Sequence, residues 1–185
     1  MQDSSPTSVT CKDCGLTYVP DVPEDRDSHA VRHGLLMETI SPNPLPNFQS
    51  RGTRNPMLVT ADSPSWAHFQ MYGRALAFLQ ELNVGFLQWG AHGAPHATAR
   101  GYLIEDDTGT FPTGSIGGAC AFGFANYTHR PATWVMEWAW LAPGARRKGL
   151  LTRQLALFQH EFGQFDLAPP LSTPMVNFVR KHGLG

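Results

Sequence analysis

Two cysteines and two histidines near the N-terminus have the spacing of a zinc site. Cys11, Cys14, His29 and His33 form the pattern C-x2-C-x14-H-x3-H. Structural zinc sites take four sulfur or nitrogen ligands at the corners of a tetrahedron. A tight turn supplies the cysteine pair, and one turn of helix brings the two histidines to the same face. We predict a structural zinc ion here rather than a chance grouping of these residues.

The segment that links the two ligand pairs has the wrong charge for nucleic acid. Between residues 21 and 33 it carries four acidic residues against two arginines. A helix that reads DNA needs cationic or amide side chains on its exposed face. The whole chain adds no attraction, because 14 basic and 15 acidic residues leave a net charge of −1. We therefore expect a finger that is structural or docks a protein, and no direct nucleic-acid binding.

A second candidate site lies in residues 133–162, where a strand, a short loop and a helix are expected to follow one another. The loop ends in Arg146-Arg147-Lys148-Gly149, at the point where the helix should begin. Free backbone N–H groups and the helix dipole favour an anion at such a point, and three cations add positive charge. The alternative is a basic loop that is only solvated.

The elements that position these residues alternate between strands and helices from about residue 57 onward. The hydrophobic pattern indicates strands at residues 57–61, 101–105, 115–125, 133–141 and 165–168. Helices are expected after Asp62-Ser63-Pro64, from about Gly149, and over residues 172–182. This order predicts an α/β fold with a mixed central sheet flanked by helices.

Apolar spacing also predicts which side chains form the core. One buried helical face is expected from Phe69, Tyr72, Leu76 and Leu79. A second is expected from Leu151, Leu155, Phe158 and Phe162. One core face of the strand at 133–141 is expected from Trp134, Met136, Trp138 and Trp140. Cys120 lies on an apolar strand and is expected in the core as well.

Composition and proline content divide the chain into four parts. Hydrophobic residues make up 42% and charged residues 16%, which suits one sizeable domain with a small appended module. The parts are a polar, disordered tail (1–10), a Cys/His unit (11–36), a proline-rich linker (37–56) and the main domain (57–185). Neither a membrane span of about 18 apolar residues nor a signal peptide is recognisable. We expect a cytoplasmic protein, or a nuclear one in a eukaryote.

Residues 57–185 resemble a GNAT-family N-acetyltransferase. Residues 146–151 are similar to the family's R/Q-x-x-G-x-G/A signature for acetyl-CoA, with Arg146 and Gly149 matching and Leu151 in the last position. The stretch WLAPGARRKG resembles its strand-Pro-loop-Arg pattern, and YLIEDD followed by GSIGGACAF resembles its central hairpin. The resemblance implies a GNAT fold and direct transfer of acetyl from acetyl-CoA to an amine.

The Cys/His unit closely resembles the zinc finger of the cohesin acetyltransferases, which establish sister-chromatid cohesion. The shared features of CKDCGLTYVPDVPEDRDSHAVRH are CxxCG, a following aromatic residue, Glu-Asp and HxxxH. Those enzymes place the finger ahead of a GNAT domain and carry an Arg-Arg-Lys loop. The resemblance implies zinc in the finger and favours a lysine of a protein substrate as the acetyl acceptor.

The GNAT resemblance also implies which residues hold acetyl-CoA. Strand backbone and the amides at the start of the following helix are expected to bind it. These residues are Ala139, Trp140, Leu141, Arg146, Arg147, Lys148, Gly149, Leu150, Leu151 and Thr152.

Direct transfer requires a base that takes a proton from the amine. Glu137 is the candidate, because it is the only charged residue on its strand and GNAT enzymes often carry a glutamate there. The alternative is a structural glutamate paired with an arginine. Ser172 or Thr173 is a candidate for stabilising the leaving thiolate, and His92 and His96 are candidates for the acceptor site.

Two further interpretations stay open. One is an acetyltransferase for small-molecule amines, such as an antibiotic, with a purely structural finger. The other is a GNAT-like binding module without catalysis, which Leu151 and Val179 suggest because they replace family residues. The oligomeric state is open too, and a dimer that exchanges a strand is one possible arrangement.

Overall fold

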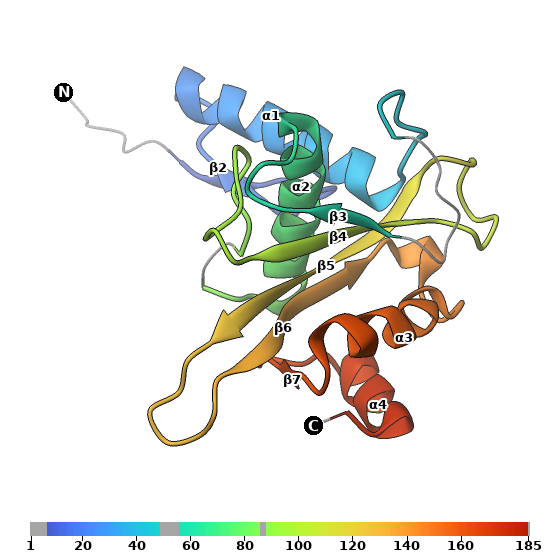
Figure 1. Cartoon of the computed structure of the whole chain (residues 1–185). Helices are drawn as coiled ribbons and strands as arrows, with labels where there is room; N and C mark the ends of the chain where they lie inside the picture. Colours follow the sequence, from blue (N-terminus) through green and yellow to red (C-terminus); the bar gives the residue numbers. More distant parts are fainter. Residues whose placement is uncertain (1–6, 49–55, 86–87, 185) are drawn as a thin grey trace.

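A five-stranded sheet forms the centre of the computed structural model, which describes residues 7–48, 56–85 and 88–184 (Figure 1). Its strands, in spatial order, are β3 (Met57–Val59), β4 (Arg100–Glu105), β5 (Ile116–Ala125), β6 (Thr133–Leu141) and β7 (Asp166–Leu167). The first four strands are antiparallel neighbours, whereas β7 pairs in parallel with β6. The mixed α/β fold expected from the sequence is confirmed.

Helices cover both faces of this sheet. One face carries α1 (Pro23–Ile40) and α2 (Ser65–Leu82), and the other carries α3 (Leu150–Phe162) and α4 (Thr173–His182) (Figure 1). A short 3₁₀ turn, η1 (Pro143–Ala145), leads into α3, and a small hairpin of β1 (Val9–Thr10) and β2 (Thr17–Tyr18) precedes α1. Each face has its own cluster of buried apolar side chains. The described part of the chain contains no helical segment with the length and hydrophobicity that a membrane span requires.

The Cys/His unit is built into the main domain. The predicted boundary after residue 36 falls inside α1, and Cys14 and Leu36 belong to the same core cluster as Met71 and Trp138. The helices α1 and α2 touch closely, since a Cβ on Gly73 would come within 2.6 Å of the Thr39 hydroxyl. The β1–β2 hairpin and α1 therefore share a hydrophobic core with the sheet.

The parts predicted as tail and linker are only partly described. Residues 1–6 of the predicted tail and residues 49–55 of the predicted linker lie outside the described residues. The last two residues before Cys11 form β1. Within the linker, Pro44 forms a bridge with Ser115, and Phe48 is buried in the core. This described stretch is thus held against the β4–β5 hairpin.

The buried face of α2 agrees only in part with the one predicted, because Leu76 is buried as expected but Tyr72 and Leu79 are only partly buried. Its inward side presents Ala67, Met71, Ala75 and Phe78, whereas Phe69 is 37% exposed. The physical reason is that α2 lies between α1 and the sheet, and small residues permit that close double packing. The aromatic residues of the predicted face, Phe69 and Tyr72, therefore lie at the edge of this packed layer. The predicted face of α3 is confirmed, because all four of its apolar residues are buried.

A β-bulge in β6 changes which way its side chains point. Ala121 pairs with Trp138, but the next residue, Phe122, pairs with Met136, so that Glu137 is an extra residue in β6. Such an insertion reverses the alternation of side chains beyond it. Met136 therefore packs in the cluster beside α3 and Trp138 in the cluster beside α2. Met136, Trp138 and Trp140 are buried in the core as predicted, but the expectation that they share one face with Trp134 is wrong.

Candidate functional site

The four predicted zinc ligands converge in the structure. Cys11 Sγ lies 3.5 Å from His33 Nδ1, and Cys14 Sγ lies 3.4 Å from His29 Nε2. All four ligand atoms lie within 4.8 Å of one another. A tetrahedral zinc ion with bonds of about 2.0–2.3 Å separates its ligand atoms by about 3.5 Å. These residues therefore fit a zinc ion.

The surroundings of the ligands support metal binding. Backbone N–H groups of Cys14 and Asp13 point at Cys11 and lower the pKa of its thiol to about 6, which favours the thiolate that zinc requires. The ring of Tyr18 stacks on His29 with 3.8 Å between ring centroids and fixes that imidazole. The helix that carries both histidines, α1, begins at Pro23 and has acidic residues in its first turn.

A cleft of about 510 Å³ opens at the C-terminal end of β6. It forms because β7 pairs with β6 only at Val135 and Met136, so that residues 137–141 have no strand beside them on that edge in the described structure. The end of α2, the loop after β6 and the starts of α3 and α4 complete its walls. All of the predicted acetyl-CoA residues except Lys148 line this cleft.

The first backbone N–H groups of α3 have no hydrogen-bond acceptor among the described residues, and the residues that carry them line the cleft. The first bond of the helix runs from the Arg153 N–H to the Gly149 carbonyl, with an N···O distance of 3.0 Å. The N–H groups of residues 150–152 come before that bond and have no acceptor within the helix. Gly149 has φ +80°, which favours glycine, and lets the chain turn sharply into α3. This geometry suits a phosphate or another anion.

Glu81, at the end of α2, engages Arg146 across the cleft. The guanidinium donates to both carboxylate oxygens, at 2.9 and 2.5 Å, and its Nε donates to the Leu141 carbonyl at 2.9 Å. The Trp140 indole N–H adds a bond of 3.0 Å to the same carboxylate. Glu81 was not predicted from the sequence, because no local pattern connects residues that are 65 positions apart.

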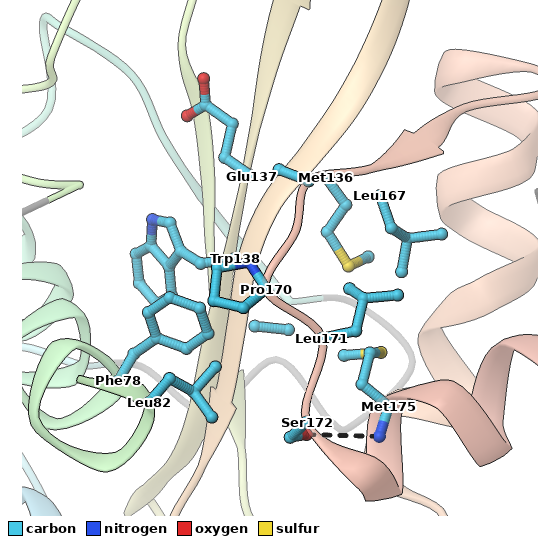
Figure 2. Close-up of a pocket in the computed structure, with 12 residues that line it drawn as sticks. Phe78, Leu82, Met136, Glu137, Trp138, Leu167, Pro170, Leu171, Ser172 and Met175 are labelled. Carbon is cyan, nitrogen blue, oxygen red and sulfur yellow. Dashed lines mark hydrogen bonds between the residues drawn. The ribbon is translucent and has the colours of Figure 1, made fainter. Parts of the chain in front are cut away.

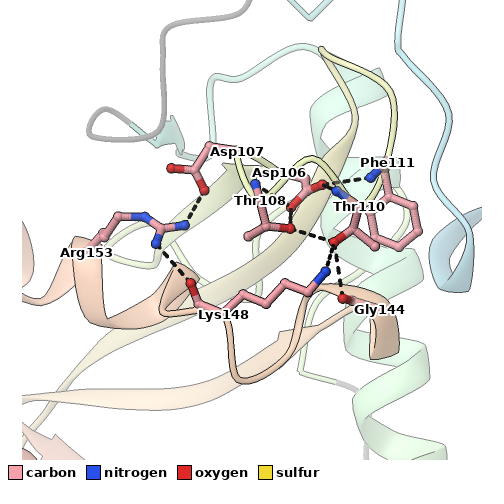
Figure 3. Close-up of polar contacts among 8 residues, drawn as sticks. All are labelled: Asp106, Asp107, Thr108, Thr110, Phe111, Gly144, Lys148 and Arg153. Carbon is pink, nitrogen blue, oxygen red and sulfur yellow. Dashed lines mark hydrogen bonds and ion pairs between the residues drawn. The ribbon is translucent and has the colours of Figure 1, made fainter.

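Lys148 lies outside the cleft because the β4–β5 turn holds it (Figure 3). Its ammonium group donates to the Thr110 hydroxyl, and its carbonyl accepts from Arg153 at 3.0 Å. Arg153 forms an ion pair with Asp107 of the same turn. Thr110 also donates to the Gly144 carbonyl at 3.3 Å. The turn is therefore fastened to the loop that precedes α3.

Asp106 organises that turn. Its carboxylate accepts bonds from the Thr108 N–H at 3.1 Å and hydroxyl at 2.6 Å, and from the N–H groups of Thr110 at 3.1 Å and Phe111 at 2.8 Å (Figure 3). Burial on its own would raise the pKa of Asp106, but these hydrogen bonds outweigh it, so the pKa is lowered. The Asp106 carboxylate is therefore held in its charged form at the centre of the turn.

Glu137 and Ser172 lie along a second, narrow pocket of about 20 Å³ that adjoins the cleft (Figure 2). The carboxylate of Glu137 points away from Ser172, so the two lie at opposite ends of the pocket. Ser172 lines both cavities and caps α4, where its hydroxyl accepts from the Met175 N–H at 3.3 Å. The Ser172 hydroxyl can still donate its own proton in a hydrogen bond.

Glu137 is less buried than its strand suggests, since its side chain is 29% exposed. Its nearest ionisable neighbour among the described ion pairs is His96, with 3.7 Å between Nε2 and Oε1, and not the arginine of the alternative interpretation. His92 is exposed and lines neither cavity. Cys120 is fully buried as predicted, and burial raises the pKa of its thiol.

Comparison with known proteins gives one family. Residues 2–35 match a family model described as the zinc-finger of acetyl-transferase ESCO. A search of curated proteins gave no match.

Three similar solved structures are all acetyltransferases. A ribosomal-protein-alanine N-acetyltransferase from Brucella melitensis biovar Abortus 2308 is 14% identical over 71% of this chain and 90% of its own, with a TM-score of 0.42. The aminoglycoside N-acetyltransferase AAC(6')-Iy, in complex with CoA, is 11% identical over 68% and 88%, with a TM-score of 0.43. The aminoglycoside antibiotic 6'-N-acetyltransferase AAC(6')-IG from Acinetobacter haemolyticus is 14% identical over 70% and 89%, with a TM-score of 0.37.

The ligand geometry and the family model agree on the N-terminal unit, which is a Cys2His2 zinc finger similar to that of the ESCO acetyltransferases.

Proposed function

We propose that this protein is an N-acetyltransferase that transfers the acetyl group of acetyl-CoA to an amine. The observation that carries the proposal is the cleft, where the unpaired edge of β6 meets the open N-terminus of α3. A strand edge suits the amide groups of pantetheine, and a helix N-terminus suits a pyrophosphate. The likeness of the finger to that of an acetyltransferase family supports the same activity.

Different residues of the cleft bind different parts of acetyl-CoA. The N–H groups of residues 150–152 bind phosphate oxygens, and Arg147, exposed at the cleft, adds positive charge. The backbone of Ala139 and Leu141 on the open edge of β6 binds the pantetheine arm. When bound, acetyl-CoA supplies an activated thioester.

Glu137 and Ser172 are proposed to handle the protons of the transfer. A lysine amine is protonated at neutral pH, so the Glu137 carboxylate first takes one proton from the ammonium group. The neutral amine then forms a C–N bond to the acetyl carbon as the C–S bond breaks. The second proton of the nitrogen goes to the leaving sulfur, which the Ser172 hydroxyl stabilises by a hydrogen bond. Glu137 returns its proton to water.

We propose a lysine on a basic protein as the acceptor. The finger is similar to that of ESCO acetyltransferases, and the start of α1 beside it exposes Glu24 and Asp27. Negative charge at that position attracts a basic partner and speeds its association. Removing both charges with Glu24→Gln and Asp27→Asn should raise KM for a basic protein severalfold and leave KM for a free amine unchanged.

The activity is tested by calorimetric titration of acetyl-CoA into zinc-loaded protein, followed by acetylation assays with basic peptides and free amines. We expect saturable binding and acetylation of lysine in peptides. Glu137→Gln should bind acetyl-CoA as tightly as wild type but lower kcat by about 10²-fold or more. No binding at millimolar acetyl-CoA would overturn the proposed function. Acetylation of free amines alone would redirect it to a small-molecule acceptor.

A further inference from the structure

The loop between α2 and β4 brings His96 beside Glu137. The imidazole Nε2 lies 3.7 Å from Glu137 Oε1, and the side chains are 41% and 29% exposed. Both lie over Gly123 of β5, where a Cβ would come within 2.8 Å of Glu137 Cδ and 3.3 Å of His96 Nε2. Three residues from three separate segments therefore meet at one point, and the lack of a side chain at Gly123 leaves room for the other two.

The loop that carries His96 is anchored on both sides. Before it, Trp89 is 1% exposed and donates its indole N–H to His68 Nδ1 at 3.3 Å. After it, Ala99 is fully buried and donates its N–H to the His96 carbonyl at 3.1 Å. The ring itself is oriented by Thr98, whose hydroxyl lies 3.0 Å from Nδ1. Although exposed, the imidazole is held in place.

The contact with Thr98 also affects which nitrogen of the His96 ring carries the proton. When the Thr98 hydroxyl donates to Nδ1, the ring proton is on Nε2, and it points toward Glu137. A side-chain rotation that moves Nε2 or Oε1 by less than about 1 Å brings the two atoms within hydrogen-bond distance. Such contacts commonly shorten when substrate binds. The bulge at Glu137 turns its carboxylate to this side of β6.

We propose that His96 is a positioning residue that holds the Glu137 carboxylate over Gly123 and aims it at the acceptor amine. This inference rests on the proposed function, in which Glu137 is the base. His96 neither gains nor loses a proton in the step. Its Nε2–H donates to one carboxylate oxygen and leaves the other free to take the proton of the ammonium group.

The test compares His96→Ala, His96→Gln and the control His160→Ala, a substitution of an exposed residue on α3, each in the wild-type and Glu137→Gln backgrounds. In the wild-type background His96→Ala should lower kcat about tenfold without changing KM for acetyl-CoA. His96→Gln should restore most of kcat, because its amide N–H reaches the position of Nε2. In the Glu137→Gln background His96→Ala should lower kcat by less than about a further twofold, and His160→Ala should leave kcat unchanged in both backgrounds.

Gly123→Ala provides an independent variant. The added methyl group meets the end of a flexible side chain, so the protein should fold while the carboxylate is displaced and kcat falls. A loss of kcat for His96→Ala that is the same in both backgrounds would overturn the proposal. Equal activity of His96→Ala and wild type would overturn it too.

A readout that needs no turnover separates this inference from the proposed function. The ring ¹⁵N signals of His96 should shift in Glu137→Gln, while those of His160 on α3 stay unchanged. If those His96 signals do not move, the contact is absent and the inference fails, whatever the activity. If they move but wild type acetylates no acceptor, the proposed function fails and the positioning role of His96 fails with it.

Discussion

The three consecutive cations that precede α3 have three different surroundings. Arg146 is paired with Glu81, Arg147 is exposed where the chain has φ +60°, and Lys148 is bound to Thr110 outside the cleft. Sequence alone gave all three the same role. The structure leaves Arg147 as the cation of this run that is exposed at the cleft and has no ion-pair partner among the described residues.

The difference predicts unequal effects of two neighbouring substitutions. Arg147→Ala should weaken acetyl-CoA binding about tenfold, because one charge-assisted bond to phosphate is lost. Lys148→Ala should change affinity less than about twofold. Calorimetric titration of both variants at one ionic strength measures this. An equal loss for the two would mean that Lys148 leaves Thr110 when ligand binds.

Glu81 is predicted to oppose the binding of an anion. Its carboxylate neutralises Arg146 and adds negative charge to the cleft. Glu81→Gln keeps an acceptor for the Trp140 indole but frees Arg146, so acetyl-CoA affinity should rise severalfold. Glu38→Gln, exposed on α1, serves as the control in the same titration. Weaker binding by Glu81→Gln would show instead that Glu81 orients Arg146 for the ligand.

Individual residues were predictable where chemistry depends on local spacing. The zinc ligands follow from two short motifs, and the start of α3 follows from Gly149 and the basic run before it. Glu81 was not predictable as a site residue, because its partners lie on other elements. His96 was a candidate for the acceptor site, but its contact with Glu137 was not predictable for the same reason. Only the folded chain brings such pairs together.

At the scale of elements, strands and helices were predictable but their registers were not. β6 spans the predicted residues, yet the bulge at Glu137 sends Met136 and Trp138 to opposite faces. A bulge is set by the pairing with β5, and a strand that is apolar on both faces gives no sign of it. The face of α2 was predicted only in part, with Leu76 correct and Phe69 wrong, because two neighbouring layers and not one bury that helix.

The β4–β5 turn is predicted to support the loop that precedes α3. Asp106→Asn replaces a carboxylate oxygen by an NH₂ group facing backbone donors, so it should lower the free energy of unfolding by about 1–3 kcal/mol. It should also weaken acetyl-CoA binding, because the turn is fastened to that loop. Asp62→Asn, exposed before α2, is the control for thermal unfolding and titration.

The same substitution has a predictable pH dependence. The pKa of Asp106 is lowered in the folded protein, so its charged form stabilises the fold above the pKa of an unfolded aspartate, about 3.9. That contribution is lost as pH falls through the lowered pKa of the folded state. The difference in stability between wild type and Asp106→Asn should therefore be full at neutral pH and shrink below about pH 4. A difference that stays constant down to pH 2 would contradict it.

For the whole molecule, the zinc finger and the sheet share one core. Cys14 and Leu36 pack in the cluster that also holds Met71 and Trp138. Removing zinc with a chelator should therefore lower the melting temperature of the entire protein by about 5 °C or more in one transition. Circular dichroism checks this, and Cys14→Ser should show the lower temperature with no further response to chelator. An unchanged main transition would show that the finger folds separately.

The position of Trp140 has a practical consequence. This tryptophan lines the cleft, whereas the other four, all within the described residues, do not. Its indole N–H binds Glu81, and the Arg146 guanidinium carbon lies 5.6 Å from its ring centroid. A ligand that draws Arg146 toward itself alters the polarity around this one fluorophore. Intrinsic emission thus offers a label-free optical report of whether the cleft is filled, fast enough for stopped-flow mixing.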